Sequence, residues 1–152
     1  MFMLACYRAA IVDTRTPEQR RRIMQAVKNK DTKPELVVRR ALTALGYRYR
    51  LHRKELPGKP DIAFIGRRKA IFVHGCFWHW HGCPKGKPPK SRHDYWIPKL
   101  AQNVERDRTR VEQLEARGWQ VLTVWQCELG DIEALSKRLE AFVDDSKIPI
   151  DI

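Results

Sequence analysis

The sequence predicts one α/β domain, built on a mixed sheet with helices on both faces. Two observations support this fold class. Segments with strand-like alternation and segments with apolar residues at helical spacing follow one another along the 152 residues. The first three strands succeed each other through short turns, whereas a long helical segment joins the third to the fourth. Short turns suit antiparallel neighbours and a helical connection suits parallel ones, so this order indicates a mixed sheet.

Two capping-box patterns mark helix starts in the N-terminal part. Thr16–Gln19 predicts a very basic helix that reaches about residue 28, and Thr32–Glu35 predicts a second helix. Met24 is the conspicuous apolar side chain of the first helix, and core filling is its simplest explanation. Glu35 lies in the first turn of the second helix, where its default role is to favour the helix dipole.

Three strands are expected to form a meander. Residues 47–52 alternate apolar and basic side chains, and residues 61–65 and 69–74 are rich in β-branched and aromatic types. Turn-forming residues at 56–60 and 66–68 separate the three segments.

The C-terminal part predicts a helix, a strand and a helix. A helical region opens near Asp94, and Pro98 is expected to bend it. Residues 119–125 carry the strongest strand pattern of the chain, and Asp131 begins a last amphipathic helix.

The charge distribution favours a polyanionic partner. The net charge is +12, with 13 Lys and Arg against three acids between Arg15 and Lys54. From Glu128 to the end there are seven acids and three bases. A basic front of this kind suits a protein that lies on nucleic acid. A solvated charged surface is the alternative, so charge alone does not decide.

The length fits one domain with a substantial core. We expect residues 14–145 to form it, including an N-terminal arm, with residues 1–13 a flexible extension and residues 146–152 a tail. Residues 1–12 are too short for a membrane span and lack a signal-peptide pattern.

Residues 71–83 concentrate the chemistry of the chain. They hold three of the five histidines, two of the four cysteines and two of the five tryptophans. The segment begins as a strand and breaks at Gly75. A segment that only had to fold would not need so many coordinating side chains, so we interpret it as an active-site strand that runs into a metal site.

The cysteines and histidines predict a zinc site. Structural Zn²⁺ takes four nitrogen or sulfur ligands in a tetrahedron, often three cysteines and one histidine. Cys76 and Cys83 lie close in sequence, and Cys127 could supply a third thiolate from a distant strand. Spacing leaves either His79 or His81 as the fourth ligand. Buried thiols that pack as small hydrophobic groups are the alternative, but the local clustering favours metal.

Asp61, His74 and His79 predict a catalytic site. Asp61 begins a strand directly after a turn, where a carboxylate can bind a hard metal ion or simply cap the turn. In a tight hairpin His74 lies near it, at the end of the neighbouring strand. Phosphodiester cleavage needs charge stabilisation on the phosphate, which Mg²⁺ supplies, and a group of near-neutral pKa that moves a proton, which histidine supplies.

A second acidic ligand is missing from its usual place. Between residues 62 and 104 the only carboxylate is Asp94. Val73 and His74 stand where the returning strand of a metal nuclease often carries an acid. The sequence therefore indicates a histidine-assisted site, to which Glu35 could contribute from outside the metal's direct ligands.

Aromatic side chains surround this segment. Phe77 and Trp78 precede a basic loop, and Trp96 follows it. Apolar wedges of this kind can enter between base steps. Alternatively, they form a small core over the zinc loop. We favour the wedge for Phe77 and Trp78 especially, and we interpret Trp80 and Trp125 as packing residues.

Four segments are distinctive in combination: Pro57–Asp61, Ile71–His79, Asn103–Arg108 and Gly118–Cys127. Together they resemble the very short patch repair (Vsr) mismatch endonucleases, and the resemblance extends from about residue 16 to residue 139.

The resemblance implies a restriction-endonuclease-like fold with structural zinc. It implies a Mg²⁺-dependent nick beside the thymine of T·G mismatches in double-stranded DNA, which arise when 5-methylcytosine deaminates. It also implies a monomer in the bacterial cytoplasm, associated with the nucleoid, and mismatch-repair proteins are candidate partners. A restriction-type or general repair nuclease of this fold and a non-catalytic zinc-stabilised DNA-binding module remain alternatives.

The resemblance also assigns roles to matching positions. Asp61 would bind Mg²⁺ with the main-chain carbonyl of Val73, where the family often has threonine. His74 and His79 would serve catalysis, His79 as the general base. The remaining assignments are zinc ligands and DNA contacts: Cys76, His81, Cys83 and Cys127 for zinc, and Met24, Phe77, Trp78, Trp96 and Asn103 for DNA.

Overall fold

A computed structural model describes residues 15–144 of the chain. The expected N-terminal extension and C-terminal tail lie outside these residues. Four strands form one sheet in the order β1 (Arg50–Leu51), β2 (Ile62–Phe64), β3 (Lys69–His74) and β4 (Gln120–Trp125). β1, β2 and β3 are an antiparallel meander, and β4 pairs parallel with β3, so the predicted mixed sheet is confirmed.

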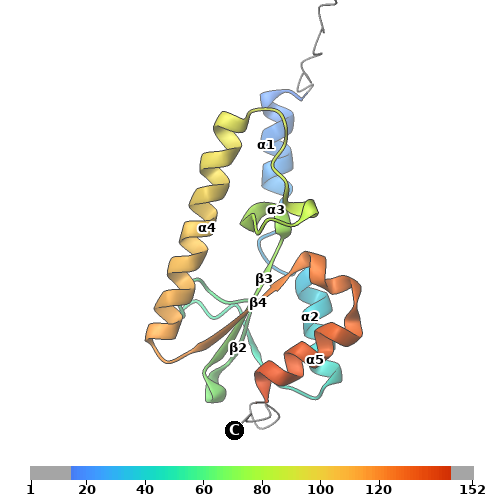
Figure 1. Ribbon diagram of the computed structural model, residues 1–152, viewed down its shortest axis with the longest axis vertical. Helices are drawn as coiled ribbons and strands as arrows, with labels where there is room; N and C mark the ends of the chain where they lie inside the picture. The colour runs from blue at the N-terminus through green and yellow to red at the C-terminus, as the bar shows by residue number, and fades with distance from the viewer. Residues whose placement is uncertain (1–14, 145–152) are drawn as a thin grey trace, which may run out of the picture.

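Helices cover both faces of this sheet, as predicted. α2 (Lys33–Ala44) and α5 (Ile132–Val143) pack together on one face, and α4 (His93–Ala116) lies along the other (Figure 1). The larger core lies between the sheet and the α2–α5 pair. Its buried members are Val38, Ala41, Leu42, Ile62, Phe64, Ile71, Val73, Val124, Leu135, Leu139 and Val143. A smaller core on the α4 face centres on Ala70, Phe72 and Leu114.

The N-terminal helices begin where the capping patterns predict. Thr16 caps α1 (Pro17–Ala26) with a complete capping box, and Thr32 caps α2 by accepting a hydrogen bond from the backbone N–H of Glu35. No side chain of α1 is buried. Met24 is 39% exposed, which excludes core filling as its explanation.

Three elements differ from the expected outlines. β1 has only two residues, and the rings of Tyr47 and Tyr49, which precede it, pack edge-on against Phe64. α4 runs continuously through Pro98. The segment after Gly75 begins with a single helical turn, α3 (Cys76–His79).

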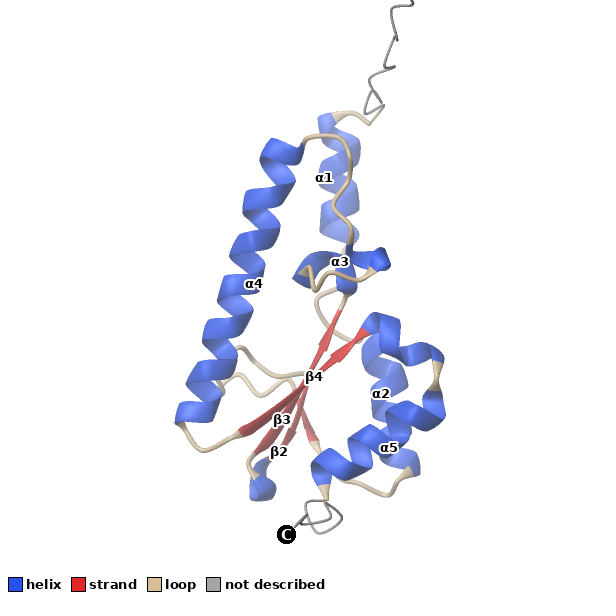
Figure 2. Ribbon diagram, in the orientation of Figure 1, coloured by secondary structure: helices blue, strands red, loops and turns tan. Residues whose placement is uncertain are grey.

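Figure 2 shows α3 beyond the end of the sheet, below α1 in this view and to the right of α4. β3 leads directly into it, so residues at the end of this strand and on this turn share one end of the molecule. Within residues 15–144, no helix has the length and apolar character that a membrane crossing requires.

Candidate active site

A groove of about 1420 Å³ lies at this end of the molecule. It is bordered by the end of α1, the start of α2, the loop before β2, the end of β3, α3 and α4. All the predicted catalytic side chains line it: Glu35, Asp61, His74 and His79. Val73, Met24, Trp78 and Asn103 line it as well. The structure thus brings together residues that the sequence analysis grouped from separate segments.

Asp61 lies immediately before β2, with its carboxylate turned to β3. Its Oδ2 accepts a hydrogen bond of 2.7 Å from the backbone N–H of Val73. Burial raises the pKa of Asp61 to about 6, and the nearby negative charge of Glu35 acts in the same direction against the Val73 hydrogen bond. Two carboxylates are therefore close enough to repel each other, and a bound cation would relieve that repulsion.

His74 and His79 form a stacked pair. Their ring centroids are 3.7 Å apart and their planes differ by 3°. His74 is 8% exposed at the end of β3. Burial, and next the positive charge of His79, lower the pKa of His74 to about 3. His74 is therefore neutral near physiological pH.

Asp107, on α4, completes this group by accepting a hydrogen bond from Nδ1 of His79. Burial works to raise the pKa of Asp107, but the hydrogen bond and the charge of His79 outweigh it, so the pKa of this carboxyl lies below its ordinary value. An ionised carboxylate can only accept, so Nδ1 of His79 carries the proton. In neutral His79 the other ring nitrogen, Nε2, is left to act as a base.

Asp107 was not among the predicted catalytic residues, although its position in the sequence carries a signal. It lies just beyond residues 62–104, where Asp94 is the only carboxylate. Asp107 lies seven residues from each of Leu100 and Leu114, the buried side chains of α4, and therefore on the same face of the helix. A carboxylate on the inward stripe of a helix needs a partner, and this pattern alone could have singled it out.

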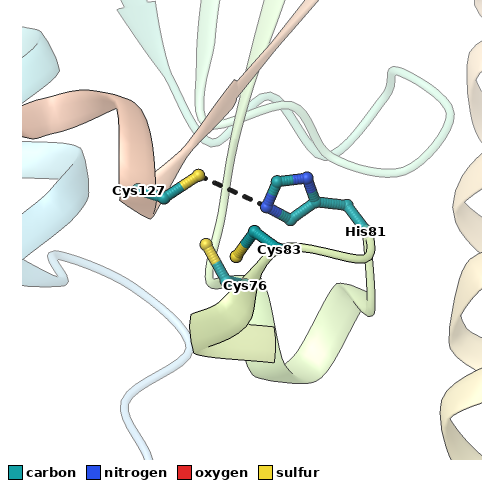
Figure 3. A group of neighbouring side chains, drawn as sticks. All are labelled: Cys76, His81, Cys83 and Cys127. Atoms are coloured by element: carbon teal, nitrogen blue, oxygen red, sulfur yellow. Dashed lines mark hydrogen bonds between the residues drawn. The ribbon is translucent and has the colours of Figure 1, made fainter. Parts of the chain in front are cut away.

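A separate group of four side chains converges at the end of β4 (Figure 3). Three come from α3 and the loop after it, and the fourth follows β4: Cys76, His81, Cys83 and Cys127. Their ligand atoms all lie within 4.8 Å of one another, and Sγ of Cys127 is 3.3 Å from Nε2 of His81. Of the two histidines that spacing left open as the fourth ligand, His81 lies with the cysteines, whereas His79 is bound to Asp107.

The surroundings of this cluster shift the pKa values of two of its thiols. Burial raises the pKa of the Cys76 thiol to about 11. Burial also works to raise the pKa of Cys83, but hydrogen bonds from the Cys76 thiol and from the backbone N–H groups of Lys85 and Gly86 hold it below its ordinary value. A Cβ on Gly86 would lie 2.5 Å from the carbonyl oxygen of Cys76, so only glycine allows this close approach.

Trp125 connects the two groups. Its ring stacks on His81 with centroids 4.0 Å apart and meets the ring of His74 edge-on at 5.3 Å. Trp125 is therefore a packing residue, as expected, and it packs between the cysteine–histidine cluster and the histidine pair.

The aromatic side chains of α3 gather with one from α4. Phe77 contacts Trp78 and Trp96 with centroid distances of 5.0 and 5.3 Å, and all three are half-buried. Asn103 donates a 3.0 Å hydrogen bond to the carbonyl oxygen of Trp78, which fixes α3 against α4. The three rings therefore form one cluster at the junction of α3 and α4. This contact is compatible with both interpretations, a small core over the cysteine–histidine loop and a wedge between base steps.

Comparison with known proteins places the chain among DNA endonucleases. The family model described as "DNA mismatch endonuclease Vsr" matches residues 12–85. The chain is 54% identical over 136 residues to the type II nicking enzyme V.XorIIP of Xanthomonas oryzae pv. oryzae, covering 90% of this chain and all of that protein. It is 40% identical to V.NmeAIP of Neisseria meningitidis serogroup A, covering 90% and 98% of the two chains. It is 38% identical to the DNA mismatch endonuclease Vsr of Escherichia coli, covering 88% of each.

The chain therefore belongs to the Vsr family of DNA mismatch endonucleases, and the resemblance found in its motifs is confirmed.

Proposed function

We propose that this protein, as a monomer, makes a Mg²⁺-dependent nick in one strand of double-stranded DNA, next to the thymine of T·G mismatches that arise from 5-methylcytosine deamination. The observation that carries the proposal is the convergence of Asp61, His74, His79 and Asp107 in one groove of a chain that belongs to this family. In the reaction, water attacks the phosphorus and the bond to one bridging oxygen breaks.

Asp61 and the carbonyl of Val73 would hold the magnesium ion. The N–H of Val73 faces Asp61, and the N–H and C=O of one strand residue point to the same side, so the carbonyl faces it too. The raised pKa of Asp61 shows that its negative charge is poorly stabilised, and a bound cation would stabilise it. Bound there, Mg²⁺ would supply positive charge against the charge that develops on the phosphate. Valine serves this role as well as threonine because the ligand is a main-chain oxygen.

His79 would take the proton from the attacking water. Asp107 holds its Nδ1–H and stabilises the positive charge that forms on the ring, as in other His–carboxylate pairs. His74, kept neutral by burial, offers an uncharged N–H to the phosphate or leaving oxygen. Glu35 would act through Asp61, since its carboxylate is already bound to its own neighbours.

Zinc is the metal that fits the second cluster best. Three thiolates and one imidazole are a common donor set of structural Zn²⁺ sites. Zinc at Cys76, His81, Cys83 and Cys127 would tie the loop that contains α3 to the end of β4. Because β3 and α3 carry both catalytic histidines, this connection would hold His79 in place.

DNA would lie along the groove, where basic side chains can neutralise phosphates. The lining cations are Lys28, Lys30, Lys33, Lys54, Lys59, Arg106 and Arg110. Phe77, Trp78 and Trp96 would enter the duplex from one side and Met24, exposed on the N-terminal arm, from the other. Asn103 would contact the DNA beside Trp78, whose carbonyl it already binds.

A nicking assay on T·G and matched duplexes with Mg²⁺ tests this function. We expect one nick, in the thymine strand of the mismatched duplex, and no nick after Asp61→Ala. Several relatives are named type II nicking enzymes, which favours a restriction-associated nuclease as the second candidate. Equal nicking of both duplexes would support that candidate, and binding without cleavage would support a non-catalytic module.

A further inference from the structure

A third group of ionisable side chains lies behind Asp61. Asp31 precedes α2, Glu35 is in its first turn, and His52 follows β1. Their carboxylate oxygens and imidazole nitrogen all lie within 4.8 Å of one another, a spacing that a metal ion could occupy.

The guanidinium of Arg39 already occupies the centre of this group. It donates to Oδ1 of Asp31 at 2.7 Å, to Oε2 of Glu35 at 2.9 Å and to Nε2 of His52 at 2.9 Å. One built-in cation thus satisfies all three groups, and we exclude a metal site here. Because a guanidinium can only donate, Nε2 of His52 is an acceptor.

Three of the four members are shielded from water, with exposed side-chain fractions of 12% for Arg39, 3% for Glu35 and 18% for His52. Asp31 is the exposed member, at 64%. The Glu35 carboxylate also accepts from the Asp31 backbone N–H and the Thr32 hydroxyl, so its orientation is fixed on several sides. Charge-assisted hydrogen bonds in such surroundings are stronger and more directional than exposed ones.

Two backbone conformations indicate what this network maintains. Asp31 has a φ of +53° and His52 a φ of +46°, in the left-handed region that residues with a Cβ rarely adopt. Such conformations persist where surrounding contacts enforce them, and they cluster at functional sites. Arg39 is the contact that the two side chains share.

The network of Arg39, Asp31, Glu35 and His52 is in direct contact with Asp61. The backbone N–H of His52 donates to the carbonyl oxygen of Asp61 at 3.3 Å. Glu35 is close enough for its charge to act on the Asp61 carboxyl. Asp31 ends the loop that connects α2 to α1, which carries Met24. Arg39 therefore joins the three segments that border Asp61.

We propose that Arg39 is a positioning residue: its guanidinium fixes Asp31, Glu35 and His52 so that Asp61 presents its carboxylate to a divalent cation. This inference rests on the proposed function in one respect, that Asp61 binds the catalytic metal. Arg39 itself is not among the residues that line the groove.

The test compares Arg39→Met, which keeps the apolar stem, with Arg39→Lys and with Arg40→Met. Arg40 is the exposed neighbour on the same helix, so its substitution removes the same charge without entering the network. We expect Arg39→Met to lower Mn²⁺ affinity, measured by titration of the protein without DNA, by about tenfold, as is usual for partners behind metal ligands. The kcat for nicking should fall by a similar factor while KM for the duplex is unchanged. Arg39→Lys should recover part of both losses, and Arg40→Met should match the wild type.

A thermal melt of each variant separates positioning from folding. If Arg39→Met lowers Tm but keeps the Mn²⁺ affinity and kcat of the wild type, the proposal is overturned. If the wild type does not nick T·G duplexes, the proposed function fails, and the Mn²⁺ titration still decides the role of Arg39: equal affinities in Arg39→Met and the wild type would overturn it.

Discussion

Asp107 on α4 binds Nδ1 of His79 on α3, although 28 residues separate them in the chain. Asp107→Asn keeps the shape of the side chain and removes its charge. We expect kcat for nicking to fall at least about a hundredfold, because the imidazolium that forms would lose its counter-charge. Single-turnover nicking rates measure this. Glu115→Gln, an exposed change on the same helix, is the control and should have no effect. An unchanged rate in Asp107→Asn would show that the contact between Asp107 and His79 has no role in catalysis.

Asp61→Asn should stabilise the Mg²⁺-free protein while it abolishes nicking. The pKa of Asp61 is raised to about 6 in the folded state, above its ordinary value. The folded state therefore binds the proton more tightly, and the free energy of unfolding falls as pH rises from about 4 to about 6. Asparagine does not ionise, so the variant keeps the free energy of unfolding that the wild type loses. The difference amounts to about 2 kcal/mol at pH 7 after allowance for partial exposure.

Urea unfolding of both proteins at pH 4 and pH 7 checks this prediction. The asparagine variant should be the more stable one at pH 7, and the two should converge at pH 4. The amide oxygen can still accept the Val73 N–H, so no buried donor is orphaned. A stability difference that is the same at both pH values would show that the carboxyl is not strained by its surroundings.

Much of this site could be predicted because its parts are local. Asp61 and His74 belong to one hairpin, whose register pairs Ile62 with Ile71, and His79 follows His74 by about one helical turn. Strand alternation and tight turns determine these relationships within a short stretch of sequence. The capping residues of α1 and α2 were predictable for the same reason.

The contacts that escaped prediction depend on tertiary packing. Asp107 meets His79 only because α4 crosses one face of the sheet and passes beside α3. Arg39 meets His52 only because β1 ends beside α2. Spacing along the sequence carries no information on either approach.

Removal of the cysteine–histidine metal should unfold the end of the molecule that carries α3. We expect one zinc ion per chain by elemental analysis, and its loss together with a lower Tm in Cys83→Ser. Structural zinc contributes on the order of 10 kcal/mol of folding free energy in small peptides, so the change should be large. The fourth cysteine of the chain, Cys6, lies outside the described residues, and Cys6→Ser is the control that should retain zinc. Full zinc content in Cys83→Ser would remove Cys83 from the ligand set.

Gly58→Ala should destabilise the protein more than Gly46→Ala, although both glycines have a positive φ, of +74° and +83°. A left-handed alanine costs about 1 kcal/mol at either position. A Cβ at Gly58 would also lie 2.9 Å from Cδ of Arg110 and 3.1 Å from Cζ of Phe72, whereas Gly46 has nothing within 4 Å. Overpacking should add about 1–3 kcal/mol at Gly58. Because Arg110 lies beside Asp107, nicking should also weaken in Gly58→Ala alone. Urea unfolding and nicking rates of the two variants measure this, and equal losses would mean that the groove wall yields to the added methyl group.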